Sequence, residues 1–398
     1  MFWFTLKHKL YVTAIGVLMK LAPGAKYQLF SGEHSSEQLC VYLARTGVKR
    51  VMLVTDKPLV ATGLVARVSK ALTGLGLEVV VYDGVLPDPD FSVIDAGLAC
   101  YREHDCDAIL AVGGGSSIDA AKVIALAVTN PGNPERYIGF SKLKQAPAPL
   151  YALPTTSGTG SEATTGAIMS RNETREKVII ADPGLLPLAS ALDPLLLTGL
   201  PPAITAATGM DALTHAIEAY IGHWDAGDSM SKAASAVRLI FEHLPRACAD
   251  GDDIAARDGM AHAAYMAGQA INQVNVGNVH AIAHQLGAAY GIPHGLANAC
   301  VLPHVLALSR PNADQRLAEL AQVIGRQGAQ GFVDAVRELN VEIGIAEVID
   351  DLRAEDIAAL AQRAVREGAG YPVPYLMSVA DCSALLRQLQ PGGQEIVG

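Results

Sequence analysis

Cysteine is scarce in this chain, and the few cysteines present form no framework. There are six, at positions 40, 100, 106, 248, 300 and 382, and they include no CxxC pair and no dense cluster in 398 residues. Secreted disulfide scaffolds are short and dense in cysteine, so this pattern excludes that class. We predict six reduced thiols that serve for packing in a cytoplasmic protein.

Positive charge is also limited. Charged residues make up 18% of the chain, the formal net charge is -10, and no long run of lysine or arginine occurs. Because nucleic-acid binding depends on clustered cations, a nucleic acid is excluded as a partner. Hydrophobic residues at 50% are typical of a globular protein, and the length favours two or three domains over one.

No uninterrupted apolar stretch is long enough to cross a membrane. The most apolar segment is the first 21 residues, MFWFTLKHKLYVTAIGVLMKL, which Lys7, Lys9 and Lys20 interrupt. A secretory signal fits poorly, because aromatic residues precede the first charge and Lys20 stands where a small-residue cleavage site is expected. We predict an apolar leader helix over residues 1–24 that packs on the protein or a second subunit, with peripheral membrane contact through residues 1–21 as the alternative.

The rest of the sequence begins with alternating strand and helix patterns. Short β-branched runs at 49–55, 77–83 and 107–112 are separated by amphipathic stretches such as LVARVSKALTGLG. This alternation predicts a parallel sheet with both faces covered, and further strands are expected at 149–154 and near 176–182. From about residue 200 the pattern is alanine-rich and helical. We therefore predict an α/β domain over 25–200 and an all-α domain over 201–398, divided at Pro201 and Pro202.

Glycines and hydroxyl groups follow two of the expected strands. In AVGGGSSIDAAK, residues 111–122, three glycines lead directly into a helix, so the backbone can approach a phosphate and the helix N-terminus faces it. A tight turn with a helix cap is the alternative. In PTTSGTGSEAT, residues 154–164, small polar residues follow another strand; ligands bind at such strand ends, although an ordinary loop has the same composition.

Two carboxylates stand near strand ends in the first half. Asp56 ends the first strand, where it can accept hydrogen bonds from an adenosine 2′-hydroxyl and repel a 2′-phosphate, or instead cap a helix. Asp88 lies in VLPDPD, which is a proline turn unless this carboxylate also faces the nucleotide.

The second half concentrates groups that bind metal ions. GMDALTHAIEAY places Asp211 and His215 at i, i+4 on one helix face, which suits half of a metal site or a simple surface hydrogen bond. Eight of the 11 histidines lie in this half, and GNVHAIAHQLGAAYGIPHG contains His280, His284 and His294. Three nitrogens and one oxygen suit divalent iron or zinc with a position left for substrate. On spacing alone His280 and His284 could both ligate, with His294 competing for the same role.

These motifs, in this order and spacing, resemble the iron-containing, or group III, alcohol dehydrogenase family over about residues 25–390. The resemblance implies a dinucleotide-binding α/β domain, a helical metal-binding domain and an active site in the cleft between them. It implies that the metal ligands are Asp211, His215, His280 and His294. His284 then lies beside the substrate and relays a proton.

The same resemblance implies NAD and iron(II), or zinc, as cofactors, and a set of nucleotide contacts. The contacts are Gly113, Gly114, Gly115, Ser116 and Ser117 at the pyrophosphate, Thr155, Thr156 and Thr159 at the nicotinamide, and Asp88 and Lys177 elsewhere on the nucleotide. Asp56 matches the position that selects NAD over NADP.

The predicted activity is hydride transfer between NAD(H) and a primary alcohol or aldehyde, with the metal as Lewis acid on the substrate oxygen. A small-molecule substrate and a homodimer or higher homo-oligomer are expected. One alternative is a dehydroquinate synthase-like lyase or cyclase, which needs several basic residues for a phosphorylated substrate; HAIAHQLGAAYGIPHG contains no lysine or arginine. The other is a membrane-docked, non-enzymatic scaffold, which the intact set of metal donors disfavours.

Overall fold

The computed structural model describes residues 27–224 and 227–392, so the predicted leader over residues 1–24 lies outside the described residues. The described chain divides into two compact units. Of the described residues, the α/β unit contains 27–199 together with Asp252–Tyr265. The helical unit contains Leu200–Gly251 and the chain from Met266 onward.

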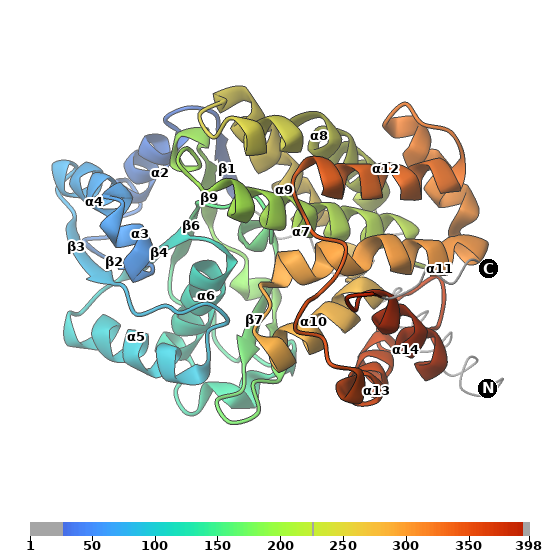
Figure 1. Cartoon of the computed structure of the whole chain (residues 1–398). Helices are drawn as coiled ribbons and strands as arrows, with labels where there is room; N and C mark the ends of the chain where they lie inside the picture. Colours follow the sequence, from blue (N-terminus) through green and yellow to red (C-terminus); the bar gives the residue numbers. More distant parts are fainter. Residues whose placement is uncertain (1–26, 225–226, 393–398) are drawn as a thin grey trace. The chain divides into compact units, whose positions relative to one another are not determined.

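A six-stranded sheet in the order β1-β9-β6-β4-β2-β3 forms the centre of the α/β unit (Figure 1). All neighbouring strands in it are parallel, which confirms the predicted parallel sheet. Its strands are β1 (Gln28–Ser31), β2 (Arg50–Val54), β3 (Glu78–Tyr82), β4 (Ala108–Gly113), β6 (Leu150–Pro154) and β9 (Ala189–Leu192).

Helices cover both faces of this sheet (Figure 1). They are α2 (Ser35–Ala44), α3 (Lys57–Ala61), α4 (Leu64–Gly74), α5 (Phe91–Glu103) and α6 (Gly115–Thr129). Since side chains alternate along a strand, Val51 and Leu53 of β2 join the core with α2 and α4, whereas Met52 and Val54 join the core with α5 and α6. Burial on both faces explains why the strands are almost continuously apolar.

A second, three-stranded sheet has the order β5-β8-β7. It consists of β5 (Gly139–Phe140), β7 (Gly166–Ser170) and β8 (Lys177–Ala181), with β7 antiparallel to β8. The strand expected near 176–182 is β8, and it therefore lies outside the main sheet. Short 3-10 turns connect these elements: η1 (Pro134–Tyr137), η2 (Ser161–Ala163), η3 (Pro183–Leu185) and η4 (Pro194–Leu196).

The helical unit confirms the predicted all-α second half. Its elements are α7 (Pro202–Ile221), α8 (Ser229–Ala249), the end of α9 (Ile254–Val274), α10 (Asn278–Tyr290), α11 (His294–Val323), α12 (Gly328–Glu342), η5 (Ala354–Asp356), α13 (Ile357–Gly368) and α14 (Val379–Gln388). Helix α7 is buried on every side from Gly209 to Ile221. A helix surrounded in this way is normally apolar, so each charged residue within it needs a partner.

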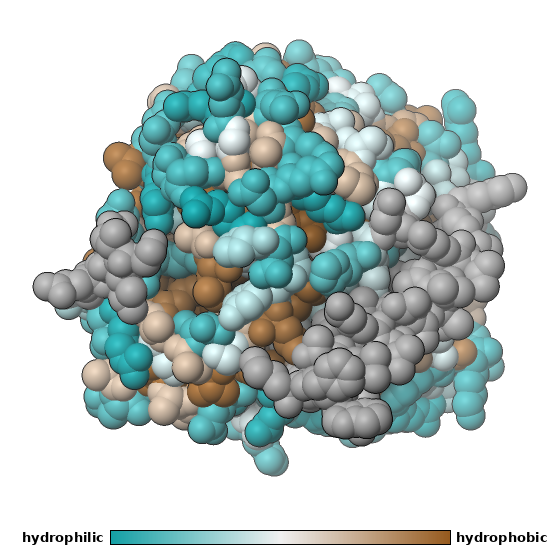
Figure 2. Space-filling model, turned by 90° about the vertical axis from the view of Figure 1, so that its right-hand side faces the viewer, coloured by the Kyte–Doolittle hydropathy of each residue, from teal (hydrophilic) through white to brown (hydrophobic). Residues whose placement is uncertain are grey.

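The described residues contain no helix that is long and apolar enough to cross a membrane. Figure 2 shows mainly hydrophilic residues over one face of the molecule, with apolar ones scattered between them. None of the six cysteines forms a disulfide, and four of them are buried.

Candidate metal centre and nucleotide site

Three of the four predicted metal ligands converge on a carboxylate oxygen of the fourth in the helical unit. Asp211 lies in the buried middle of α7, and His215 follows one turn later on the same face. His280 comes from the first turn of α10, and His294 is the first residue of α11. Oδ1 of Asp211 lies 3.8, 3.7 and 3.5 Å from the Nε2 atoms of His215, His280 and His294, respectively.

This donor set fits a divalent transition metal. Bonds of roughly 2.0–2.2 Å to carboxylate oxygen and imidazole nitrogen place the ligating atoms of one ion about 3–4 Å apart. One ligand atom each from Asp211, His215 and His280 all lie within 4.8 Å of one another. His294 joins this group through Asp211, and its side chain is 31% exposed whereas Asp211 is 4% exposed. The cluster thus has three buried donors and one on its accessible side.

The charges of this cluster favour an anionic carboxylate. Burial alone would raise the pKa of Asp211, but the neighbouring imidazoles, His215 first, lower it below its usual value. Burial likewise tends to lower the pKa of His280, but hydrogen bonds to Asp211 and Glu218 raise it to about 9. An ionised carboxylate among imidazoles is the donor arrangement that a divalent cation requires.

A buried carboxylate that was not predicted orients His280. Nδ1 of His280 lies 2.6 Å from Oε2 of Glu218, and both side chains are buried. The sequence did contain a signal, because Glu218 follows Asp211 by seven residues in the same motif, a spacing that keeps it on the same helix face.

His284 lies beside the donor cluster, and its contacts include His294 and Glu367. Its ring stacks on His294 at a centroid distance of 5.2 Å, and its Nδ1 lies 2.5 Å from Oε1 of Glu367. The same oxygen accepts a hydrogen bond from the Tyr371 hydroxyl at 2.7 Å, and Oε2 accepts one from Gln285. Burial would raise the pKa of Glu367, but the hydrogen bond with His284 lowers it. That His294 ligates and His284 does not stays a prediction.

Asn298 is a second buried residue that the sequence analysis missed. Its Nδ2 donates to Oδ1 of Asp211 at 2.8 Å and lies 3.3 and 3.2 Å from the Nε2 atoms of His280 and His294. Its Oδ1 has no hydrogen-bond partner among the described residues. The Asn298 amide therefore belongs to the immediate surroundings of the donor cluster.

Gly295, directly after His294, allows α11 to start against the backbone of α7. A Cβ atom added there would lie 2.1 Å from the carbonyl oxygen of Ala207 and 3.3 Å from Cβ of Asp211. No side chain fits into this contact, so the close approach of the two helices depends on glycine.

The predicted phosphate loop lies at the carboxyl end of β4 in the α/β unit. Gly113 has a φ of 156°, which is rare for other residues. Added Cβ atoms on Gly113, Gly114 and Gly115 would lie 2.4, 3.1 and 2.5 Å from the side chains of Ser117, Thr156 and Thr159. Glycine at these three positions therefore lets the loop backbone pack closely against these side chains.

The second polar loop meets the first at the next strand. Gly113 pairs with Pro154 where β4 and β6 run in parallel, and the backbone N–H of Thr155 donates to the Gly113 carbonyl at 3.0 Å. No side chain caps the start of α6, so its first backbone N–H groups are available to an anion. Ser117 and Thr155 are buried, whereas Ser116 is half-buried at the helix start. These features fit a nucleotide pyrophosphate.

Asp88 and Lys177, 89 residues apart in the chain, are brought together. The Lys177 ammonium donates to Oδ1 of Asp88, and Asp88 adopts a φ of 53°, in the left-handed region. Asp56 is placed as a helix cap: its Oδ1 accepts from the backbone N–H of Leu59 at 2.7 Å. The helix cap, which was the alternative role for Asp56, is thus present in the structure. The contact of Asp56 with a nucleotide stays a prediction.

A buried polar cluster locks the two nucleotide loops together. The fully buried Lys122 of α6 donates to Ser161 Oγ at 3.1 Å, Thr164 Oγ1 at 3.0 Å and the Gly166 carbonyl at 2.5 Å. Asp119, 3.7 Å from the ammonium, accepts from Ser161 and from the backbone of Ile168. Burial lowers the pKa of Lys122 to about 8.

Both halves of the chain match models of one protein family. Residues 27–194 match the family model described as iron-containing alcohol dehydrogenase, and residues 205–390 match that of the C-terminal part of the Fe-containing alcohol dehydrogenase family. The 1,3-propanediol dehydrogenase of Klebsiella pneumoniae is 39% identical over 355 residues, covering 86% of this chain and 92% of that protein. The NAD-dependent methanol dehydrogenase of Bacillus methanolicus is 34% identical over 366 residues, covering 89% and 96%. A crystal structure of 1,3-propanediol oxidoreductase has a TM-score of 0.88 at 37% identity and covers 92% of this chain and 100% of its own.

A parallel α/β unit with a glycine-lined strand end, and a helical unit with one carboxylate among imidazoles, define a metal- and NAD-dependent oxidoreductase. The chain belongs to the iron-containing alcohol dehydrogenase family. Its chemistry is the NAD-dependent interconversion of alcohols and aldehydes.

Proposed function

We propose that this enzyme oxidises small primary alcohols or reduces the corresponding aldehydes, and that Asp211, His215, His280 and His294 hold its iron(II) or zinc ion. The observation that carries this proposal is the convergence of three imidazole nitrogens, at 3.5–3.8 Å, on one buried carboxylate oxygen. When bound, the metal supplies Lewis acidity toward the substrate oxygen, and the nicotinamide supplies the redox chemistry.

His284 is proposed to handle the proton of the substrate hydroxyl at Nε2. Its Nδ1 is engaged with Glu367, so Nε2 is the nitrogen left to exchange a proton on the substrate side. Glu367 holds the ring in this orientation, and the Tyr371 hydroxyl, which donates to the same carboxylate, fixes the carboxylate in turn.

In the α/β unit we propose that the three glycines and the start of α6 bind the pyrophosphate. The glycines allow backbone approach, and the uncapped helix start provides N–H donors and the positive end of its dipole. Thr155, Thr156 and Thr159 are proposed to position the nicotinamide. Asp56, with one oxygen used as a cap, is proposed to hold the adenosine ribose with the other and so to disfavour NADP.

The test is NAD⁺ reduction by metal-loaded enzyme over a panel of primary alcohols, diols and hydroxy acids. Because relatives include a 1,3-propanediol dehydrogenase, a methanol dehydrogenase and lactaldehyde reductases, the panel contains 1,3-propanediol, methanol and 1,2-propanediol. Chelation is expected to abolish turnover, and ferrous or zinc ion is expected to restore it. Full activity of a demonstrably metal-free preparation would refute the role of the metal.

We further propose a homodimer or higher homo-oligomer located in the cytoplasm. Six cysteines that form no disulfide are consistent with a reducing compartment. Light scattering on the purified protein measures the oligomeric state. Sedimentation with anionic liposomes, with and without residues 1–21, tests peripheral membrane contact; equal sedimentation of both forms would argue against it.

A further inference from the structure

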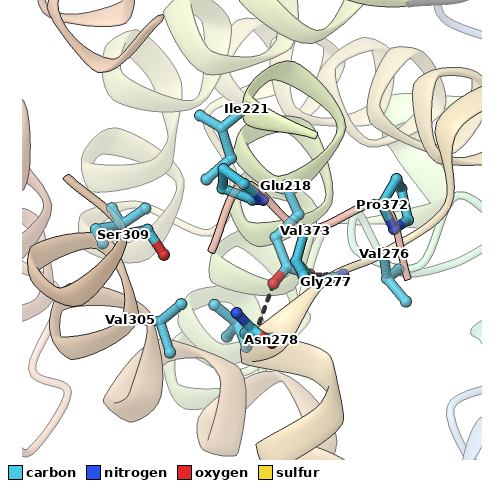
Figure 3. A pocket seen from close by; sticks show the side chains of 12 residues that line it. Glu218, Ile221, Val276, Gly277, Asn278, Val305, Ser309, Pro372 and Val373 are labelled. Atoms are coloured by element: carbon cyan, nitrogen blue, oxygen red, sulfur yellow. Dashed lines mark hydrogen bonds between the residues drawn. The ribbon is translucent and has the colours of Figure 1, made fainter. Parts of the chain in front are cut away.

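Glu218 lies in α7 on the same face as Asp211 and His215, and its carboxylate is directed at the start of α10. Oε2 accepts the backbone N–H of Gly277 at 2.7 Å, and Oε1 accepts that of Val279 at 2.7 Å. Figure 3 shows the carboxylate of Glu218 turned toward this segment. Since Gly277 cannot cap α10 with a side chain, Glu218 takes over that function and places a negative charge at the positive end of the helix dipole.

The same carboxylate determines which nitrogen of His280 carries hydrogen. An ionised carboxylate only accepts, so Nδ1 of His280, 2.6 Å from Oε2 of Glu218, is the protonated nitrogen. A bound metal ion would take the place of any proton on Nε2, and it is this atom that lies 3.7 Å from Oδ1 of Asp211. The opposite tautomer would direct an N–H bond at the donor cluster and could not ligate.

Glu218 also affects the charge of the buried cluster. Asp211 carries one negative charge and the imidazole ligands none, so a divalent ion would leave one uncompensated positive charge. Within the described residues the ion-pair partner of Glu218 is His280. Because no lysine or arginine neutralises it there, its charge is available to balance that of the ion.

We propose that Glu218 is a positioning residue of the metal centre, which fixes the tautomer of His280 and couples its orientation to the register between α7 and α10. This inference rests on the proposed metal site. Partners of this kind typically change metal affinity by 10- to 100-fold.

The test compares four proteins by metal affinity, measured in competition with a chromophoric chelator, and by the visible spectrum of the Co²⁺-loaded protein. In Glu218→Gln the amide cannot accept from all three donors, so we expect a 10- to 100-fold loss of affinity and an altered Co²⁺ spectrum. Glu319→Gln is the matched control: Glu319 accepts from Tyr220 of α7 at 2.9 Å and does not contact the donor cluster. It is expected to bind within twofold of wild type.

Gly277→Ala provides the second, independent variant. It retains every donor, but its Cβ would lie 2.7 Å from Oε1 of Glu218 and would displace that carboxylate. We expect a loss of affinity in the same direction, and ¹⁵N NMR of labelled histidine should show a changed tautomer of His280. If Glu218→Gln does not fold, Gly277→Ala decides the question.

Wild-type affinity and an unchanged Co²⁺ spectrum in Glu218→Gln, or in Gly277→Ala when the first variant is unfolded, would overturn the role of Glu218. Wild-type protein that binds no metal would instead overturn the proposed metal centre itself. The two failures are therefore distinguishable.

Discussion

Lys122 offers a direct test of how the nucleotide loops are held. Its side chain is fully buried, and it donates to the hydroxyls of Ser161 and Thr164 and to the carbonyl of Gly166, while Asp119 supplies the opposing charge. The variant Lys122→Met retains most of the length of the side chain and removes its charge and its three donors. Asp119, whose side chain is 13% exposed, then retains only the hydrogen bonds from Ser161 and Ile168.

The expected loss of unfolding free energy depends on which charged group is left without its partner. Removing one partner of a buried ion pair costs about 3–5 kcal/mol, because the other charge is left uncompensated. Since Asp119 retains two donors, we expect the lower end of this range, about 3 kcal/mol. The double variant Lys122→Met/Asp119→Asn leaves no charge and should lose only about 1–2 kcal/mol, from unpaired polar groups. A favourable coupling between the two sites is thus expected.

The assay is urea-induced unfolding of wild type, both single variants and the double variant, with the NAD⁺ dissociation constant measured on the same proteins. Because Lys122 joins α6 to the segment after β6, Lys122→Met should weaken NAD⁺ binding as well as stability. A loss of unfolding free energy below 1 kcal/mol for Lys122→Met would refute the reasoning, and so would a double variant that is less stable than Lys122→Met.

Three further outcomes are expected. Metal content measured by mass spectrometry should fall in His280→Ala and in His294→Ala, whereas His284→Ala should retain its metal and turn over more slowly. A metal-free His284→Ala protein beside a metal-replete His294→Ala protein would reverse the assignment. Asp56→Gly should increase activity with NADP⁺ relative to NAD⁺, and a wild type that already prefers NADP⁺ would contradict the placement of Asp56. Burial raises the pKa of Glu162 from 4.5 to about 7, so this group stabilises the fold fully below pH 4.5 and loses that contribution as the pH rises through 7. As the pH falls from 7 to 4.5, the free energy of unfolding of wild type should rise by up to about 3 kcal/mol relative to that of Glu162→Gln. Parallel curves of unfolding free energy against pH for the two proteins would contradict this prediction.

Much of the fold could be predicted because its determinants are local. Alternating β-branched runs and amphipathic stretches indicate parallel strands and covering helices whichever neighbours they have. The sheet to which a strand belongs could not be predicted in this way. The sequence of β8 is as apolar as those of the main-sheet strands, but β8 pairs with β7 in the second sheet. Nothing in the residues of a single strand specifies which edge it joins.

From spacing alone, only those site residues whose contacts are local in the sequence could be predicted. Asp211 and His215 are visible as a pair because helix geometry fixes their spacing. Glu218 and Asn298 act across 62 and 87 residues, on His280 and Asp211 respectively, and such partners appear only once the helices are packed. For Asp56 the local alternative, a helix cap, is present in the structure and is compatible with a second contact.

The contact between Gly295 and the backbone of Ala207 has a consequence for how this enzyme tolerates substitution. A residue without any donor atom sets how near His294 comes to Asp211, because any side chain there would force α11 away from α7. In a saturation screen scored by retained metal, position 295 is therefore expected to be as intolerant as the ligands themselves. Inventories of reactive side chains would overlook it, since what this position contributes is the absence of one.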